Sequence, residues 1–338
     1  MKRILIKNGI LVNEDQQYAA DILVEGTYIA KIGTDLSHPH AEVIDAQGGF
    51  VFPGVIDDQV HFREPGLTHK GCIASESRAA VAGGTTSFME QPNTNPQTVT
   101  LEALEQKMAM GAASSVANYS FLLGGTNDNL EEIKRLDPRA TSGIKLFLGS
   151  STGNMLVDDP QVIEKIFRAT PLVISAHCED EATIRAQMAW AQETYGDQMT
   201  PELHPVIRNA EACYLSSSRA IALARATGAR LHVFHLSTGI EMDLLAPGPL
   251  KGKQITAEVC IHHLWFSDED YATKGNLIKW NPAVKSPADR EALWAGLLED
   301  RIDVIATDHA PHTWEEKNKP YAQAPSGGPL VQHSLVAM

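Results

Sequence analysis

Five short apolar segments in this chain each lead into a side chain that can bind a metal ion or be modified to do so. These side chains are His61, Lys145, His177, His235 and Asp308, and they are spread over most of the sequence. The carboxyl ends of parallel strands share one edge of a sheet, and a (β/α)8 barrel builds its active site there. The pattern therefore predicts a metal-dependent enzyme with a barrel fold.

From residue 52 onward, strand-like segments alternate with helical ones such as Leu101–Gly111, Glu179–Gln192 and Ile207–Thr227. Such alternation predicts an α/β fold with a parallel sheet, and eight repeats predict a closed (β/α)8 barrel of the TIM type. The predicted strands are Val55–Phe62, Thr85–Met89, Val116–Leu123, Gly143–Leu148, Leu172–Ala176, Leu231–His235, Gln254–Cys260 and Val304–Thr307.

The first 51 residues show a different pattern, in which short strands follow one another with turns and without a helical stretch. Hairpin signals of this density predict a small β-sheet domain over residues 1–51. Asn8-Gly9 is interpreted as a turn between two strands, Arg3–Lys7 and Ile10–Asn13.

The barrel is expected over residues 52–338, which is longer than the roughly 250 residues of a typical barrel. After the eighth strand an apolar helical start at Pro329 runs to Met338 without a cap or turn signal. A helix this short is marginal without a packing partner. The chain is therefore expected to be cut in its last helix.

Composition excludes several classes of function. The net charge of −14 argues against nucleic acid as a partner, because phosphate binding needs clustered Lys and Arg. No stretch reaches the roughly 20 apolar residues that span a membrane, and no signal peptide precedes the first strand, so the cytoplasm is expected. Ordinary thiols, rather than disulfides or a structural zinc knot, are expected at Cys72, Cys178, Cys213 and Cys260.

The histidines become informative only as a group. A single histidine at a strand end is more often a hydrogen-bonded structural residue, but His61, His177 and His235 together predict a catalytic zinc site. Lys145 would ordinarily reach out to solvent. Burial would instead lower its pKa and expose a nucleophilic amine, which could take up CO2 as a carbamate that bridges two metals.

The remaining candidates concern proton transfer and substrate. Asp308 is a candidate general acid/base, with helix N-capping as the alternative. Arg63, Asn93 and His312 together suggest a small anionic substrate, since Arg is well suited to binding a carboxylate. The alternatives are that Arg63 pairs with Glu64 at the surface and that Asn93 shapes a turn.

At these positions the sequence resembles the dihydroorotases of the amidohydrolase superfamily, and among them the bacterial long-chain type. The resemblance runs from about residue 50 to about residue 330 in the family's order. The matching motifs are Pro53-Gly54-Val55-Ile56-Asp57, His61-Phe62-Arg63, Gly83-Gly84-Thr85-Thr86, Pro92-Asn93-Thr94, His177-Cys178-Glu179-Asp180, Asn281-Pro282 and Thr307-Asp308-His309-Ala310-Pro311-His312.

The resemblance implies an amidohydrolase-type barrel with a small N-terminal β-sandwich unit. It implies reversible cyclisation of N-carbamoyl-L-aspartate to L-dihydroorotate in de novo pyrimidine biosynthesis, with one or two zinc ions that activate hydroxide. Carried over by position, His61 and Asp308 would hold one zinc ion. His177 and His235 would hold the other, and a carbamate on Lys145 would bridge them.

The same resemblance assigns roles around the substrate. Asp308 would also be the general acid/base, Asn281 would contact the ring, and the substrate carboxylate would be bound by Arg63, Asn93 and His312. The family further implies a homodimer, and it suggests an association with aspartate transcarbamoylase.

One departure from the family concerns the metal ligands. Gln59 stands where the family usually has histidine, and its neutral carbonyl oxygen is a poor match for zinc. We therefore expect either one firmly held zinc ion or a weak second one. Two other interpretations remain, a hydantoinase or allantoinase, and a catalytically silent homologue that serves as a structural partner. Arg63 and Asn93 argue against the first, because allantoinases lack that arginine and hydantoinases lack both features.

Overall fold

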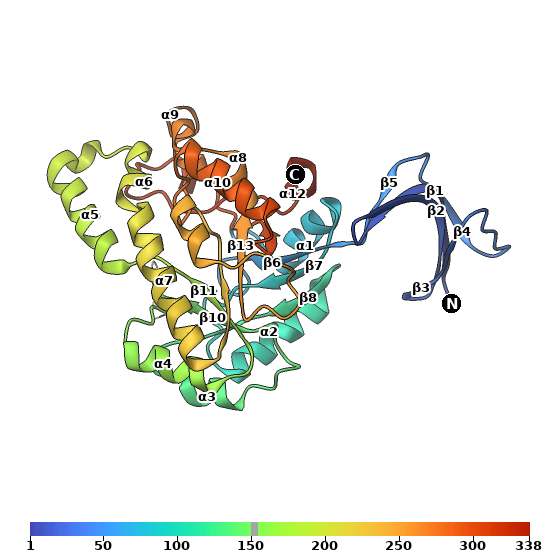
Figure 1. The fold of residues 1–338 in the computed structure, drawn as a ribbon, viewed down its shortest axis with the longest axis horizontal. Helices are drawn as coiled ribbons and strands as arrows, with labels where there is room; N and C mark the ends of the chain where they lie inside the picture. Colours follow the sequence, from blue (N-terminus) through green and yellow to red (C-terminus); the bar gives the residue numbers. More distant parts are fainter. Residues whose placement is uncertain (150–154) are drawn as a thin grey trace. The chain divides into compact units, whose positions relative to one another are not determined.

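The structure is a computed structural model that describes residues 1–149 and 155–338. The chain divides into two compact units, Met1–Val55 and Ile56–Met338 (Figure 1). Among the described residues, no helix is both long enough and apolar enough to cross a membrane.

The first unit is a β-sheet with strand order β3-β2-β1-β4, and β5 also pairs with β1. Its apolar core is formed by Leu11, Ala20 and Ile22. The strands are β1 (Arg3–Asn13), β2 (Gln16–Glu25), β3 (Tyr28–Gly33), β4 (Glu42–Asp45) and β5 (Phe50–Val51).

The predicted turn at Asn8-Gly9 is wrong, because β1 continues through it to Asn13 as one strand with a bulge. Asn8 adopts a left-handed backbone with φ 58°, and its N–H donates to the carboxylate of Asp21 at 2.9 Å. That bond replaces the one lost in the β1–β2 ladder, so the chain bends without reversing. The reversal comes later, at Glu14 and Asp15, whose φ angles of 50° and 57° suit a tight hairpin.

The second unit contains the eight predicted strand regions, the third of which is divided into β8 and β9. All of the pairings recorded between these strands are parallel. The strands are β6 (Val55–Val60), β7 (Thr85–Glu90), β8 (Asn118–Phe121), β9 (Leu123–Gly124), β10 (Ile144–Phe147), β11 (Val173–His177), β12 (Arg230–Val233), β13 (Ile255–Cys260) and β14 (Val304–Ala306).

Two parallel sheets result, with orders β14-β13-β12-β11-β10-β9 and β6-β7-β8. At one edge a backbone hydrogen bond joins the two sheets, because His61 at the end of β6 donates to His309 after β14 at 2.7 Å. At the other edge β8 and β9 follow each other in the chain with only Leu122 between them, and Leu122 donates to Glu90 on β7 at 3.0 Å. The second unit is therefore an α/β structure whose two parallel sheets are linked at both edges.

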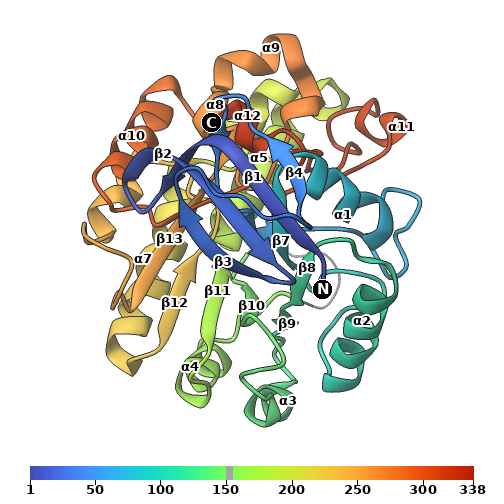
Figure 2. The same cartoon turned by 90° about the vertical axis from the view of Figure 1, so that its right-hand side faces the viewer.

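Helices lie around the strands of the second unit (Figure 2). The α-helices are α1 (Ile73–Ala82), α2 (Leu101–Ser114), α3 (Leu130–Arg135), α4 (Pro160–Ala169), α5 (Glu181–Tyr195), α6 (His204–Ile207), α7 (Ala210–Thr227), α8 (Ile261–Trp265), α9 (Tyr271–Lys274), α10 (Pro287–Leu298), α11 (Trp314–Lys317) and α12 (Ser334–Ala337). The 3-10 helices are η1 (Gly196–Gln198), η2 (Pro201–Leu203), η3 (Gly239–Leu244), η4 (Asp268–Asp270) and η5 (Gly275–Ile278).

Local sequence explains where these elements begin and end. The long helix α7 begins after Asn209, whose side chain accepts the N–H of Ala212, and ends at Gly228 in the left-handed conformation that glycine tolerates. Strand β10 is buried along its whole length, as expected for a parallel strand covered on both faces. Lys145 is therefore buried together with its apolar neighbours on β10.

The helical start predicted at Pro329 is wrong, since α12 begins only at Ser334. The imidazole Nδ1 of His309 accepts the backbone N–H groups of Leu330 at 3.0 Å and Val331 at 3.2 Å. These bonds hold the segment against His309 and delay the helix.

Candidate active site

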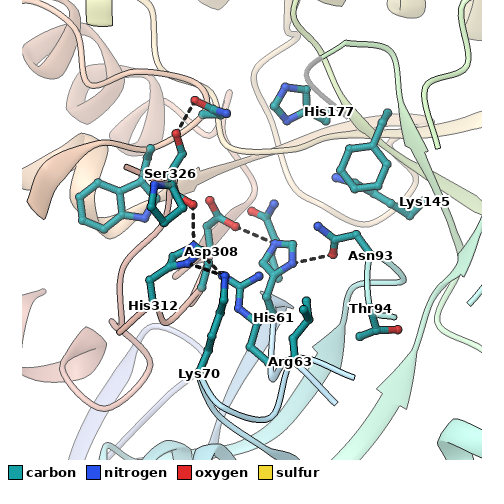
Figure 3. Close-up of a pocket in the computed structure, with 18 of the residues that line it drawn as sticks. His61, Arg63, Lys70, Asn93, Thr94, Lys145, His177, Asp308, His312 and Ser326 are labelled. Carbon is teal, nitrogen blue, oxygen red and sulfur yellow. Dashed lines mark hydrogen bonds and ion pairs between the residues drawn. The ribbon is translucent and has the colours of Figure 1, made fainter. Parts of the chain in front are cut away.

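A cavity of about 670 Å³ lies at the carboxyl ends of the parallel strands, a volume in the range of small-molecule sites. Every site residue that the sequence predicts lines this cavity, and several of them are shown in Figure 3. They are His61, Arg63, Asn93, Lys145, His177, His235, Asn281, Asp308 and His312.

Strained backbone directs several of these side chains. Arg63, His235 and Asp308 follow β6, β12 and β14, and their φ angles are 70°, 40° and 46°. A left-handed conformation costs a residue with a side chain of the order of 1–3 kcal/mol, and it persists where the surroundings enforce it. At His235, for example, the backbone N–H is held by the carboxylate of Glu258 at 3.0 Å. The strain is concentrated where the strands deliver side chains to the cavity.

His177 and His235 face each other across part of the cavity. His177 Nδ1 lies 2.9 Å from His235 Nε2. The other ring nitrogen of His235 is buried and has no hydrogen-bond partner among the described residues. Burial lowers the pKa of both imidazoles. Two neutral imidazole nitrogens directed at one place are a donor pair that zinc binds.

A buried carboxylate holds His177 in this orientation. Glu179 accepts from His177 Nε2 at 2.8 Å and also pairs with Arg208. Burial alone would raise the pKa of Glu179, but the charge of Arg208 and the bond from His177 lower it to about 2. A carboxylate behind a histidine is the usual support of a metal ligand, because it fixes the ring and makes it more basic.

His61 and Asp308 form the opposite part of the cavity. His61 Nδ1 lies 2.8 Å from Asn93 Oδ1, and His61 Nε2 lies 3.0 Å from Asp308 Oδ1 (Figure 3). Because the amide oxygen of Asn93 can only accept, Nδ1 carries the proton of the neutral ring. Nε2 then presents a lone pair beside a carboxylate, an arrangement that is repulsive unless a proton or a metal ion lies between them. The donor atoms on this side therefore also fit a metal ion.

Gln59 and Lys145 complete the donor set. Gln59 lines the cavity, but its Oε1 accepts a weak hydrogen bond from the thiol of Cys260 at 3.4 Å. Lys145 is 1% exposed, so the alternative that it reaches solvent is wrong. Burial lowers the pKa of Lys145 to about 7, against the charges of Glu258 and Asp308. Near neutral pH a large fraction of this amine is uncharged and nucleophilic.

A cationic cluster occupies the cavity wall near Asp308. Arg63 is 8% exposed, and its Nη2 lies 3.0 Å from His312 Nε2. Lys70 Nζ lies 3.1 Å from the other ring nitrogen of His312. Burial, with the charges of Arg63 and Lys70, lowers the pKa of His312 to about 3. The ring is thus neutral between two cations. Lys70 also pairs with Glu316 at 3.1 Å, so Arg63 is the group of this cluster best suited to an additional anion.

The alternatives for Arg63 and Asp308 are wrong. Glu64 accepts the backbone N–H of Ile73 rather than pairing with Arg63, which donates instead to the carbonyl of Pro311. The next helix, α11, is capped at its N-terminus by Thr313, so Asp308 does not cap it.

Sequence reasoning missed three residues that take part in the site. Lys70 lies nine positions after His61, in the loop that follows the same strand. That position after a strand end could have marked Lys70 as a site residue. Glu179 was named only within the motif His177-Cys178-Glu179-Asp180, without a role of its own. Ser326 donates to Asn281 Oδ1 at 3.0 Å, and no local pattern marks that contact.

Comparison with known proteins places the chain in a family. A model of the "Dihydro-orotase-like" family matches residues 48–240. The dihydroorotase of Halobacterium salinarum is 37% identical over 321 residues, which cover 93% of this chain and 72% of that protein. The chain belongs to the dihydro-orotase-like family.

Other members of this family and related amidohydrolases are also similar. The allantoinase of Deinococcus radiodurans is 34% identical over 315 residues, covering 91% of this chain and 69% of that protein. The solved structure of L-hydantoinase (dihydropyrimidinase) from Arthrobacter aurescens superposes with a TM-score of 0.92 at 28% identity. The superposition covers 100% of this chain and 76% of the hydantoinase chain. The proteins similar to this chain are thus named as enzymes that act on different ring substrates.

Proposed function

We propose that this protein is a dihydroorotase, which reversibly closes N-carbamoyl-L-aspartate to L-dihydroorotate in pyrimidine biosynthesis. The observation that carries the proposal is the cationic cluster of Arg63, Lys70 and His312 in the same cavity as Asp308. Dihydroorotate bears a carboxylate on a ring carbon that one methylene group separates from the carbonyl carbon of the bond that is broken, so it needs an anion site in the same cavity as an acid/base. Similarity to the dihydroorotase of Halobacterium salinarum supports the same substrate.

The fold proposed for this activity is a closed (β/α)8 barrel. The bond from His61 to His309 supports closure because it joins the edge strands β6 and β14, and at the other edge only Leu122 separates β8 from β9. A closed ring would bring the strand ends that carry His61 and Asp308 next to each other.

The proposed cofactor is zinc. His177 and His235 would hold one ion, His61 and Asp308 would hold a weaker one, and a carbamate on Lys145 would bridge them. When bound, zinc would polarise a carbonyl group and make water available as a nucleophile near neutral pH.

Proton transfer is assigned to Asp308. In ring opening its carboxylate takes the proton of the attacking water and passes it to the ring nitrogen as the carbon–nitrogen bond breaks. In ring closure the same group moves the proton in reverse. The strained φ of 46° at Asp308 fixes the carboxylate at the end of β14, beside His61.

Substrate orientation is assigned to the cavity wall. Arg63 and Lys70 bind the carboxylate, and His312 stays neutral between them so that it accepts or donates a hydrogen bond rather than adding charge. Asn93 and Asn281 extend this wall toward the ring. Together these groups place the ring with its amide toward Asp308.

A second candidate is a hydantoinase or allantoinase, favoured by the similarity to the Deinococcus radiodurans allantoinase and the Arthrobacter aurescens hydantoinase. Neutral rings of that kind would give the buried guanidinium of Arg63 no substrate carboxylate to bind. A third candidate is a silent homologue, favoured by Gln59.

One substrate panel separates these candidates. Protein loaded with zinc in bicarbonate buffer is given L-dihydroorotate, allantoin or hydantoin, and ring opening is followed by absorbance or chromatography. The dihydroorotase proposal predicts turnover of L-dihydroorotate and a strong loss of it in Arg63→Met. Preference for a neutral ring would contradict the proposal in favour of the second candidate. No turnover of any ring by folded, zinc-loaded protein would support the third.

A further inference from the structure

A second cluster of metal-binding side chains lies inside the second unit, below the strand ends that form the candidate active site. Asp58 on β6, His232 on β12 and Glu258 on β13 each contribute one atom, and these atoms all lie within 4.8 Å of one another. His232 Nε2 lies 3.3 Å from Asp58 Oδ2 and 3.4 Å from Glu258 Oε2. Hydrogen bonds between charged groups are shorter, at about 2.7–2.9 Å. Ligand atoms on a tetrahedral zinc ion, bonded at about 2.0–2.2 Å, lie roughly 3.3 Å apart.

The tautomer of His232 favours a cation at Nε2. His232 Nδ1 lies 2.8 Å from Thr256 Oγ1, and the hydroxyl of Thr256 is directed at the carbonyl of Leu231. Thr256 therefore accepts the proton of Nδ1. Nε2 of the neutral ring then presents its lone pair to two carboxylates, which is repulsive unless a proton or a metal ion lies between them.

The contact distances favour a metal ion over a proton. His232 Nε2 lies 3.3 Å and 3.4 Å from the two carboxylates, which is farther than in a hydrogen bond between charged groups and close to the separation of two ligand atoms on one zinc ion. Glu258 is fully buried. Asp58 Oδ1 is also buried and has no hydrogen-bond partner among the described residues. A divalent ion with a neutral His232 balances both carboxylates, which matters because buried unpaired charge is costly.

The cluster can be reached from solvent. A cavity of about 720 Å³ opens at the amino ends of the strands and is lined by Asp58, His232 and Thr256. Ser142 and Ser175 line the same cavity. It gives an ion a route to the cluster and leaves room for a water molecule as the fourth ligand.

We propose that Asp58, His232 and Glu258 bind a divalent transition metal, such as zinc, at a site separate from the candidate active site. The ion ties β6 to β12 and β13 across the interior. The site adds to the proposed function and does not depend on it, because its ligands are not assigned a catalytic step. Glu258 offers Oε2 to the cluster while its Oε1 accepts the backbone N–H of His235.

Metal content tests the proposal. The unmodified protein, Asp58→Asn and the control Glu241→Gln are loaded with zinc, dialysed and measured by elemental analysis. Glu241 is a buried carboxylate that accepts from Thr238 and lies outside the cluster. We expect Asp58→Asn to hold one zinc ion per chain fewer than the other two proteins. Equal zinc in all three would overturn the proposal.

A second variant leaves the cluster intact, and so tests the site even if Asp58→Asn does not fold. His177→Asn/Asp308→Asn removes one candidate ligand from each side of the active site. We expect this double variant to retain one zinc ion per chain and, with cobalt in place of zinc, to show the visible absorption of a tetrahedral ion. A folded double variant that binds neither metal would overturn the proposal.

Discussion

The two sides of the active-site cavity differ in how well they are equipped to hold a metal ion. On one side, His177 and His235 oppose each other, and Lys145 is buried with a lowered pKa. On the other side, His61 faces Asp308, while Gln59 offers only an amide oxygen that is engaged by a thiol. The first side thus offers two imidazoles and an amine, whereas the second offers one imidazole, a carboxylate and an amide oxygen that is already hydrogen-bonded.

The groups behind the ligands differ in the same way. His177 is backed by a carboxylate that is ionised through Arg208, whereas His61 is backed by the neutral amide of Asn93. A carboxylate makes the imidazole a stronger ligand, and an amide only orients it. From this comparison we infer that the side of His177 and His235 has the higher affinity for a metal ion and that the other side mainly positions Asp308. Four substitutions test this division.

The largest effect is expected from Asp308→Asn. The amide cannot accept and return a proton, so kcat for L-dihydroorotate should fall by about 10²–10⁴-fold. Steady-state kinetics measure the change, and the exposed residue substituted in Asp300→Asn is the control. Activity within a few-fold of the unmodified enzyme would mean that another group transfers the proton.

The next effect is expected from Arg63→Met. Loss of a charged hydrogen bond to the substrate carboxylate should lower kcat/KM by about 10²-fold, mostly through KM. Kinetics with L-dihydroorotate measure it, with the exposed Arg78→Met as a matched control. An unchanged KM would remove Arg63 from the anion site.

A smaller effect, on metal affinity, is expected from Glu179→Gln. Without the carboxylate behind His177, the free zinc concentration needed for half-maximal activity should rise by about 10–100-fold. Reactivation of chelated enzyme at buffered zinc concentrations measures this, and Glu181→Gln at the start of α5 is the control. If both variants reactivate alike, the support of His177 does not govern zinc binding.

The smallest effect is expected from Gln59→His, which restores the missing donor. The free zinc needed for half-maximal activity should fall by up to about tenfold, equal to about 1.4 kcal/mol. The same reactivation assay measures it, with the unmodified enzyme as reference. A rise in the zinc requirement would show that the contact between Gln59 and Cys260 supports the site.

Much of this site could be predicted because strand ends are visible in the sequence. Alternating apolar segments located the strands that carry His61, His177 and Asp308, and parallel strands bring such residues to one edge. Residue type alone favoured a Lys145 that reaches solvent, and the family resemblance assigned it to the site. The structure buries it, together with every other residue of β10.

The remainder depends on contacts between distant segments. Asp21 turns the expected break at Asn8 into a bulge, and His309 delays the helix after Pro329. Lys70 belongs to the site only because the loop after β6 folds toward His312. Each outcome is decided by one or two hydrogen bonds between segments distant in the sequence, which local propensity does not contain.

The division between the two sides is tested most directly by anomalous scattering at the zinc edge from crystals of the zinc-loaded protein. The account predicts a strong peak bounded by His177, His235 and Lys145, and a weaker peak or none beside His61 and Gln59. Equal peaks on the two sides, or no peak beside His177, would contradict it.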